Sequence, residues 1–325
     1  MIYIESNSRD PYFNLALEEY VFEELDPNEE YFMLWQNDNT IVVGKYQNTA
    51  QEINQAFVDE HKIKVARRLS GGGAVYHDKG NLNFTFIVGE REHGLNFNQF
   101  IQPVIRTLAG LGIHAEFTGR NDITIGGKKI SGNSQYVKRG RIMHHGCILV
   151  DSNLTNVSEA LRPKEAKFEC KSAKSVASRV TTINACSPTE ITVESFKKAL
   201  AAEVLGSGAT RYELTESELE VVRNLAHEKY ETWDWNYGKS GNYNYEKSQR
   251  YDFGSVEVSA VIRNATIQEI KIHGDFFGNG EIAELEEALV GEPLDEKLAD
   301  RIASKIDVDH YIKGMSAKQL SEQIR

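Results

Sequence analysis

The chain has 325 residues, of which 40% are hydrophobic and 26% charged, as is typical of a soluble protein with one large and one smaller domain. A net charge of −11 argues against nucleic-acid binding, and no apolar run approaches the roughly 20 residues that span a membrane. The start "MIYIESNSRDPYFN" has no basic region followed by an apolar core, so we expect a cytoplasmic protein, by default a monomer. Three cysteines without CxxC spacing predict neither a disulfide framework nor a zinc site.

The first two thirds of the chain predict helices alternating with strands. Asp10 and Pro11 supply an N-cap and a first helical residue for the amphipathic segment "YFNLALEEYVFEEL". Strands are predicted at "YFMLWQ" and "TIVVGKYQ" around the turn "NDN", and at "KVARRLS", "NLNFTFIV" and "HGCILV"; "DITI" and "KKISG" flank a diglycine turn like a hairpin. Further helices are expected over 97–111, kinked or begun late at Pro103, and near 193–205 and 215–229.

The composition changes at "YETWDWNYGKSGNYNYEKSQR", which is rich in Tyr, Asn, Gly and Ser and is typical of a linker. Beyond it, two strands joined at Asn264-Ala265 precede two acidic helices. We therefore expect an α/β protein with mixed α+β sheets. A large domain over 1–240 is followed by a small α+β accessory domain over 241–325.

Positive charge is gathered into three segments of this acidic chain. Residues 62–79 carry five Lys/Arg against one acid, 120–141 carry six against one, and 162–179 carry six against two. All three segments also contain glycine or serine. Such clusters suit a compact anionic ligand better than a long polyanion.

The stretch "ARRLSGGGAVYHD" combines two arginines with three glycines. Backbone without Cβ atoms lets several N–H groups converge on an anion. Arg67 and Arg68 occupy successive strand positions, so their side chains should point to opposite faces. We expect Arg68 to face a ligand and Arg67 to have a structural or domain-docking role.

The stretch "GRNDITIGGKKISG" is the second candidate site. Asp122, beside Asn121, could hold a hydrated Mg²⁺, which takes one or two carboxylates together with phosphate oxygens. Lys129 lies between the diglycine turn and "ISG", where it could neutralise a reacting anion as a point charge.

Two adjacent histidines, His144 and His145, precede "GCILV". On a strand they should point to opposite faces, and we expect one to be packed and the other exposed. Cys147 shares a face with His145, so a Cys–His nucleophilic pair is conceivable. A buried strand instead favours cysteine as a small hydrophobe.

Together these stretches resemble the lipoate–protein ligase family, whose relatives are the octanoyltransferases and, more distantly, the biotin ligases. The resemblance covers nearly the whole chain and rests on "RRLSGGGAVYHD", "GRNDI", "KKISGNSQ" and "HHGCILV", with "DPYFNLALEEY", "VGKYQN", "KSVASRVTTI" and "WDWNYG". It implies a biotin/lipoate ligase-like adenylating domain and the family's accessory C-terminal domain. It also implies a two-step reaction, in which lipoate and ATP form lipoyl-AMP and pyrophosphate with Mg²⁺ assisting. The lipoyl group then passes to a lysine of an apo lipoyl domain, in 2-oxoacid dehydrogenase complexes or the glycine cleavage H protein.

The motif match also implies roles for individual residues. Lys129 would be catalytic, bridging the lipoyl carbonyl and the α-phosphate, and Asp122 would hold Mg²⁺. The nucleotide would contact Arg68, Gly73, Ala74, Val75, Tyr76, Asn121, Asp122 and Lys129. Lipoate would contact Ser70, Gly71, Gly72, Asn83, Lys129 and His145, and its tail would lie in an apolar tunnel near Leu15, Trp35 and Val42.

Two other functions stay open on the residues alone. An ATP-independent octanoyl- or lipoyltransferase would need an acyl-accepting cysteine, for which the candidates are Cys147, Cys170 and Cys186. A non-catalytic lipoate- or nucleotide-binding module is the other alternative. The accessory domain, and the presence of Lys129 together with the glycine segment, favour the ligase.

Overall fold

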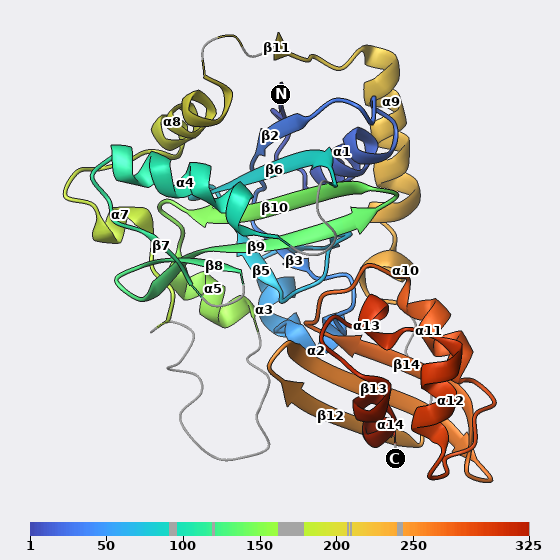
Figure 1. The fold of residues 1–325 in the computed structure, drawn as a ribbon. Helices are drawn as coiled ribbons and strands as arrows, with labels where there is room; N and C mark the ends of the chain where they lie inside the picture. The colour runs from blue at the N-terminus through green and yellow to red at the C-terminus, as the bar shows by residue number, and fades with distance from the viewer. Residues whose placement is uncertain are drawn as a thin grey trace. The chain divides into compact units, whose positions relative to one another are not determined.

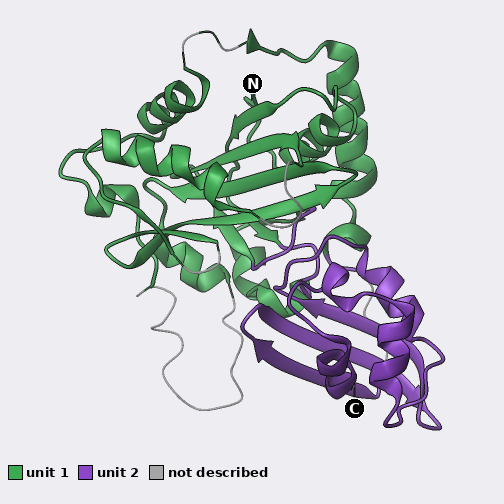
Figure 2. Ribbon diagram, in the orientation of Figure 1, with its two compact units in different colours: residues 1–43, 49–68, 74–236 green, residues 44–48, 69–73, 237–325 purple. Residues whose placement is uncertain are grey.

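The computed structural model describes residues 1–90, 96–118, 121–161, 179–206, 208, 210–238 and 243–324. The chain forms two compact units, drawn in green and purple in Figure 2. The large unit comprises residues 1–43, 49–68 and 74–236, and the small unit comprises 44–48, 69–73 and 237–325. The chain therefore passes between the units at 43/44, 48/49, 68/69, 73/74 and 236/237.

The large unit is built around a mixed eight-stranded sheet with the order β11-β1-β2-β6-β10-β9-β8-β7 (Figure 1). Its strands are β1 (Ile2–Glu5), β2 (Tyr31–Trp35), β6 (Asn81–Gly89), β7 (Glu116–Thr118), β8 (Asp122–Ile125), β9 (Lys128–Lys138), β10 (Arg141–Leu149) and β11 (Thr210–Arg211). β1 pairs in parallel with β2 and β11, and the remaining pairs are antiparallel. The predicted hairpin of "DITI" and "KKISG" is confirmed as β8 and β9.

A second, three-stranded sheet of the large unit has the order β4-β3-β5. Its strands are β3 (Thr40–Val43), β4 (Lys64–Arg67) and β5 (Val75–His77). β3 pairs in parallel with β4 and antiparallel with β5. The segment "NDN" between β2 and β3 consequently joins two sheets instead of closing a hairpin.

Helices cover both faces of the eight-stranded sheet. α1 (Pro11–Glu23) begins after the predicted N-cap, Asp10, and reaches Thr85 on β6 through Glu18. α4 (Asn98–Gly110) packs Phe100 against Phe86 on the same strand. Because Thr85 and Phe86 are neighbours and point to opposite faces, α1 and α4 lie on opposite sides of the sheet. Further helices are α2 (Thr49–Glu52), α3 (Gln55–Glu60), α5 (Leu154–Ala160), α7 (Ile183–Cys186), α8 (Val193–Leu205), α9 (Glu216–Leu225), the π-helical turn η1 (Ala226–Tyr230) and α10 (Trp233–Asn236).

The small unit contains an antiparallel sheet of β12 (Tyr245–Tyr251), β13 (Gly254–Arg263) and β14 (Thr266–Gly274). Residues of this sheet and of four helices form its hydrophobic core. The helices are α11 (Ile282–Leu289), α12 (Leu298–Lys305), α13 (Val308–Tyr311) and α14 (Ala317–Ile324). β13 and β14 are joined at Asn264-Ala265, as predicted, and both turn residues have positive φ, 50° and 53°.

A segment from the N-terminal part of the chain completes this unit. The ring of Tyr46 stacks on Phe276 with centroids 4.9 Å apart. Its carbonyl accepts a hydrogen bond from Gly274 N at 2.7 Å, and its hydroxyl donates to Gly280 O at 3.0 Å. Lys45 pairs with Glu281 at 2.9 Å.

Two details differ from the sequence-based expectations. The predicted linker contains β12 and α10, because its alternating residues pair with β13 and its two tryptophans begin a helical turn. Pro103 lies inside α4, which starts five residues earlier at Asn98, so a late helix start is wrong. Residues 162–178, which carry most of the third basic cluster and part of "KSVASRVTTI", lie outside the described residues. Among the described residues, no helix is both long and apolar enough to cross a membrane.

Candidate active site

Five strands align residues of the predicted site in one row across the large sheet. Trp35 on β2 lies opposite Asn83 on β6, and Asn83 lies opposite Cys147 on β10. Cys147 lies opposite Gly132 on β9, which in turn lies opposite Asp122 on β8. Residues directly opposite each other share a face of the sheet. We call this the site face; it is the face that α1 covers.

Lys129 reaches the site face from the β8–β9 hairpin. Its Nζ lies 2.7 Å from Asp122 Oδ1, and a Cβ atom built on Gly132 would lie 3.0 Å from that Nζ. The glycine therefore leaves the space that the ammonium group occupies. Thr181 N donates to the carbonyl of Lys129 at 2.9 Å, and the lysine side chain is 35% exposed. The main chain of Lys129 is thus held by a hydrogen bond, while its ammonium group stays accessible at the edge of the row.

Arg68 supplies a second cation from the end of β4. The residue is buried, and its Nη1 donates to Val42 O at 3.2 Å. Burial lowers the pKa of Arg68 to about 10, so the group stays charged at neutral pH; Cys147 and Glu18 act in the opposite direction. The thiol of Cys147 interacts electrostatically with both Lys129 and Arg68. The two predicted cations, 61 positions apart in the numbering, therefore both lie within electrostatic range of Cys147 on the site face.

His145 is held by a carboxylate from α1. Its Nδ1 lies 3.0 Å from Oε1 and 3.3 Å from Oε2 of Glu18. Thr85 Oγ1 donates to the same Oε1 at 2.5 Å and accepts from Trp35 Nε1 at 3.0 Å. Because a carboxylate only accepts, this arrangement favours the tautomer of His145 with its proton on Nδ1. The network fixes the orientation of the imidazole on the site face.

The expectation of one exposed histidine at 144–145 is wrong. His144 is 0% exposed and His145 is 7% exposed, because β10 lies inside the sheet with helices on both faces. His144 stacks on Phe100 with ring centroids 4.7 Å apart, and its Nδ1 lies 3.0 Å from Gln135 Nε2. It is a core residue of the face opposite the site.

Two buried donor atoms near the row have no hydrogen-bond partner among the described residues. They are Nδ2 of Asn83 and Nε2 of His77, in residues that are 1% and 3% exposed. Asn83 Oδ1 accepts from Asn81 Nδ2 at 3.1 Å, which leaves its amide hydrogens for another acceptor. His77 interacts electrostatically with Arg68 and His145. Buried donors without partners are costly, and beside two cations they fit an anionic or carbonyl-bearing ligand.

Other predicted residues have structural partners. Asn121 Nδ2 donates to Asn133 O at 2.7 Å, and Asn133 Nδ2 donates to Asn121 O at 3.0 Å. Tyr76 is 3% exposed, and Val75 pairs with β3 in the small sheet of the large unit. Ala74 is half-buried where the chain re-enters this unit.

The four predicted residues from Ser70 to Gly73 belong to the small unit. Gly72 N donates to Phe276 O at 3.2 Å, and Gly72 has a φ of 87°. A Cβ on Gly71 would lie 2.4 Å from Phe276 O, whereas a Cβ on Gly73 would meet nothing within 4 Å. Gly71 is therefore required because the main chain of Phe276 approaches it closely, and both residues belong to the small unit.

Known proteins with similar sequences identify the family. Residues 10–205 match the model of the lipoyl protein ligase A/B catalytic domain, and residues 240–324 match the bacterial lipoate protein ligase C-terminus. The chain is 40% identical to lipoate-protein ligase LplJ of Bacillus subtilis (strain 168), over 100% of both chains. It is 41% identical to lipoate–protein ligase 1 of Staphylococcus aureus (strain Mu50), over 97% of each.

The chain belongs to the lipoate–protein ligase family.

Solved structures share the fold of this chain. P. falciparum LipL1 in complex with lipoate has a TM-score of 0.80 and 24% identity, covering 100% of this chain and 98% of its own. The bi-partite lipoate protein ligase of Thermoplasma acidophilum has a TM-score of 0.66 and 26% identity, covering 75% and 98%. Lipoate-protein ligase A bound with ATP has a TM-score of 0.62 and 24% identity, covering 73% and 97%. The predicted fold class is confirmed.

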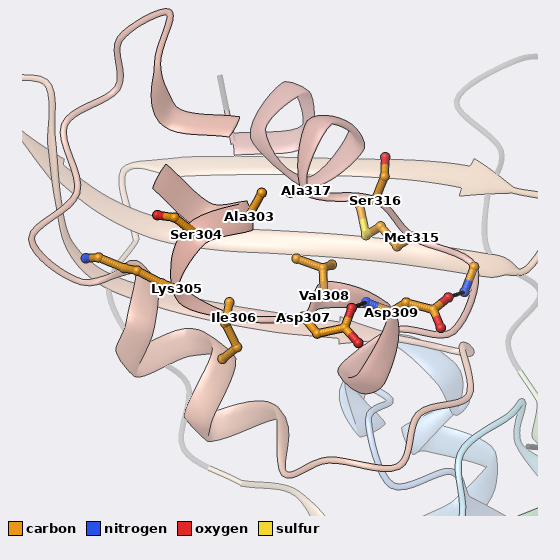
Figure 3. Close-up of a pocket in the computed structure, with 11 residues that line it drawn as sticks. Ala303, Ser304, Lys305, Ile306, Asp307, Val308, Asp309, Met315, Ser316 and Ala317 are labelled. Atoms are coloured by element: carbon orange, nitrogen blue, oxygen red, sulfur yellow. Dashed lines mark hydrogen bonds between the residues drawn. The ribbon is translucent and has the colours of Figure 1, made fainter. Parts of the chain in front are cut away.

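A groove of about 720 Å³ in the small unit of this ligase is separate from the predicted residues (Figure 3). It runs between the end of α12 and the start of α14, and its lining includes Ile306, Val308 and Met315. Asp309 at its rim is paired with Lys313 and accepts from Gly314 N at 2.8 Å. None of the residues predicted to bind lipoate or ATP lines this groove.

Glu18 and His77, which lie beside residues of the candidate site, were not predicted from the sequence. Glu18 carries a detectable signal, because it falls on the buried stripe of α1 between Leu15 and Phe22, where a charged residue needs a partner. His77 carries none, since a single histidine at the end of a short strand indicates no particular chemistry. Only the placement of β4 and β5 on either side of β3 brings it near Arg68.

The stability of this ligase should decrease as the pH falls below neutrality. Burial, reinforced by the charges of Arg68 and His145, lowers the pKa of His77 to about 3. An unfolded histidine titrates near 6.5, so this stability is complete above pH ~6.5 and is lost progressively as the pH falls towards ~3. Between pH 7 and pH 5 the loss is about 2 kcal/mol for one such histidine.

Urea unfolding at pH 7 and pH 5 measures this effect. The variant His77→Gln should show a smaller decrease in unfolding free energy than the parent. A residual decrease is expected, because burial also lowers the pKa of His144. His114→Gln, at a side chain that is 86% exposed, is the matched control. An unchanged decrease in His77→Gln would contradict the assignment.

Proposed function

We propose that the protein is an ATP-dependent lipoate–protein ligase. It activates lipoate as lipoyl-AMP and then transfers the lipoyl group to a lysine of an apo lipoyl domain. The observation that carries the proposal is that Lys129 and Arg68 both act electrostatically on the Cys147 thiol, opposite Asn83, whose amide nitrogen has no hydrogen-bond partner among the described residues. Relatives that match the whole chain bear the name lipoate-protein ligase, and a structural neighbour binds ATP.

The first half-reaction joins two anions. A carboxylate oxygen of lipoate attacks the α-phosphorus of ATP, and the bond to the β-phosphate oxygen breaks to release pyrophosphate. Positive charge fixed at this point stabilises the transition state, because its position needs no reorganisation during the reaction. Lys129 supplies charge that is accessible and adjustable, whereas buried Arg68 supplies charge that is fixed.

The second half-reaction needs a polarised carbonyl. The ε-amine of the acceptor lysine attacks the acyl carbon, the bond to the phosphate oxygen of AMP breaks, and an amide forms with release of one proton. Lys129, whose side chain is 35% exposed, polarises the carbonyl in this proposal. Asn83 Nδ2 and His145 orient the acyl group in this proposal. The tail lies against Leu15, Trp35 and Val42, all of which are buried.

Magnesium fits the site through a single protein carboxylate. Among the described residues, no three His, Cys, Asp or Glu side chains are arranged to hold a metal ion. Mg²⁺ needs only one or two carboxylates when phosphate oxygens complete its shell. Asp122 meets this requirement, since its side chain is 34% exposed and lies beside Lys129. When bound, Mg²⁺ would neutralise phosphate charge.

The proposal extends to partners and to the two parts of the chain. The acceptors are apo lipoyl domains of 2-oxoacid dehydrogenase complexes and the H protein, and the enzyme is a cytoplasmic monomer without nucleic-acid or membrane partners. Adenylation is assigned to residues 1–240, with an accessory role for 241–325. The glycine run from Ser70 to Gly73 contributes to lipoate and nucleotide binding in this assignment.

Pyrophosphate release by the purified chain tests the function. The assay compares lipoate, octanoate and biotin, each with ATP, with and without an apo lipoyl domain. We expect release to depend on lipoate or octanoate, and mass spectrometry to find the acyl group on one lysine of the acceptor. Lipoate binding without any ATP consumption would instead indicate a non-catalytic module.

The cysteine-thioester route has its own test. Burial raises the pKa of the Cys147 thiol, so the nucleophilic thiolate is disfavoured in spite of the nearby cations. We expect Cys147→Ala to keep ATP-dependent ligation within about threefold of the parent, with the exposed Cys186→Ala as the matched control. Loss of acyl transfer in Cys147→Ala, together with parental activity that needs no ATP, would establish the thioester route.

A further inference from the structure

Arg67 is the partner of Arg68 that the proposed reaction does not use. The residue is buried, and burial lowers the pKa of Arg67 to about 10, so it keeps its charge. Its guanidinium group reaches α10: Nε donates to Trp235 O at 2.8 Å, and Nη2 donates to Asn236 O at 3.0 Å. Nη2 also donates to Thr49 Oγ1 at 2.7 Å. The planar fork holds its donors on separate nitrogens in fixed directions, whereas the three donors of a lysine share one nitrogen.

The main chain of Arg67 is bound by the same helix. Its N–H donates to Asn236 Oδ1 at 2.9 Å, and its carbonyl accepts from Trp235 Nε1 at 2.9 Å. Thr49 Oγ1 closes the arrangement by donating to Asn236 O at 2.5 Å. Both the side chain and the main chain of Arg67 are therefore hydrogen-bonded to Trp235 and Asn236, the last two residues of α10. We call this arrangement the Arg67 lock.

The lock lies where the chain leaves the large unit. The chain passes between the units at 48/49, at 68/69 and at 236/237, and the lock contains Thr49, Arg67 and Asn236. Three of the five crossing points are thus tied together by one side chain, entirely within the large unit. Arg68 and then the glycine run follow directly in sequence.

We propose that Arg67 is a positioning residue that fixes three crossing points of the chain and thereby holds Arg68 and the start of the glycine run ready for substrate. This inference rests on the proposed ligase function. Without the lock, Arg68 and the start of the glycine run must become ordered when lipoate and ATP bind. The free-energy cost of that ordering reduces the apparent affinity for both substrates. Chemistry on the bound substrates changes less, because Lys129 is held by β9 and by Thr181.

The test separates KM from kcat in lipoate-dependent pyrophosphate release. Arg67→Met and Arg67→Lys should each raise the KM for lipoate and ATP by about tenfold or more, while kcat stays within about threefold. The failure of lysine to rescue would identify the fork and not the charge as the requirement. Arg106→Met is the matched control for removal of an arginine, since Arg106 is 56% exposed and paired with Glu203. Hydrogen exchange should be faster at residues 68–73 in the Arg67 variants than in the control.

Three outcomes decide the proposal. A variant that loses kcat in proportion to its folded fraction, with unchanged KM, would make Arg67 merely structural and overturn it. If neither Arg67 variant folds, Trp235→Phe removes one donor of the lock and keeps an aromatic side chain; a raised KM supports the proposal and an unchanged KM overturns it. An inactive parent chain would refute the ligase function instead, and hydrogen exchange at 68–73 would still test the lock.

Discussion

Replacing Lys129 with alanine is expected to reduce the rate of lipoate-dependent pyrophosphate release by more than tenfold, and by a factor on the order of 100 if it acts like one oxyanion-hole donor. The variant removes a cation that lies 2.7 Å from Asp122 and at the edge of the row. The fold should survive, because the lysine side chain is 35% exposed and the Asp122 side chain that loses its ion pair is 34% exposed. Rapid-quench measurement of lipoyl-AMP, with circular dichroism as the check on folding, gives the result.

Lys128→Ala is the matched control for this prediction. Lys128 precedes Lys129 on β9 and is exposed, so the substitution removes the same charge from the same hairpin without touching the row. It should stay within about twofold of the parent. Equal losses in both variants would indicate a general electrostatic effect, and unchanged pyrophosphate release in Lys129→Ala would refute the role of this lysine.

Replacing Glu18 with alanine should produce the largest change in stability. The carboxylate is 1% exposed and is the partner of His145 Nδ1 and of Thr85 Oγ1. Alanine would leave two buried polar groups without their acceptor, which costs about 3 kcal/mol of unfolding free energy. Urea unfolding monitored by tryptophan fluorescence reports this loss, because Trp35 belongs to the same network.

Two further variants serve as comparisons for Glu18→Ala. Glu18→Gln retains the oxygen that accepts from Thr85 and should recover a large part of the lost stability. Glu24→Ala makes the same change at an exposed position just after α1 and should alter stability by less than about 0.5 kcal/mol. A loss in Glu18→Ala no larger than in Glu24→Ala would mean that the network is not a stabilising one.

Local patterns predicted individual elements well. Asp10 and Pro11 fixed the start of α1, and the diglycine turn fixed the β8–β9 hairpin, because capping and turn geometry depend on neighbouring residues. The pairing of strands into two sheets could not be predicted in this way. β2 and β3 are adjacent in the chain yet belong to different sheets, and only long-range packing decides this.

In the candidate site, too, local motifs predicted some residues, whereas residues that depend on long-range contacts were missed. Motifs indicated Lys129 and Asp122, and the ion pair between them follows from one hairpin. Glu18 was missed because its function depends on a contact with His145 that spans 127 positions of the chain. The exposure of one histidine of the pair 144–145 was wrongly predicted, because strand alternation says nothing about whether the second face of a sheet is covered.

The small unit has a consequence for recombining ligases of this family. Its core interaction between Tyr46 and Phe276 joins residues 230 positions apart, and Gly71 fits against the carbonyl of the same phenylalanine. A chimera cut at the linker would inherit Tyr46 and Gly71 from one parent and Phe276 from the other. Exchangeable modules in this fold are therefore discontinuous, and a faithful graft must carry three pieces of sequence, 44–48, 69–73 and everything from 237 onward.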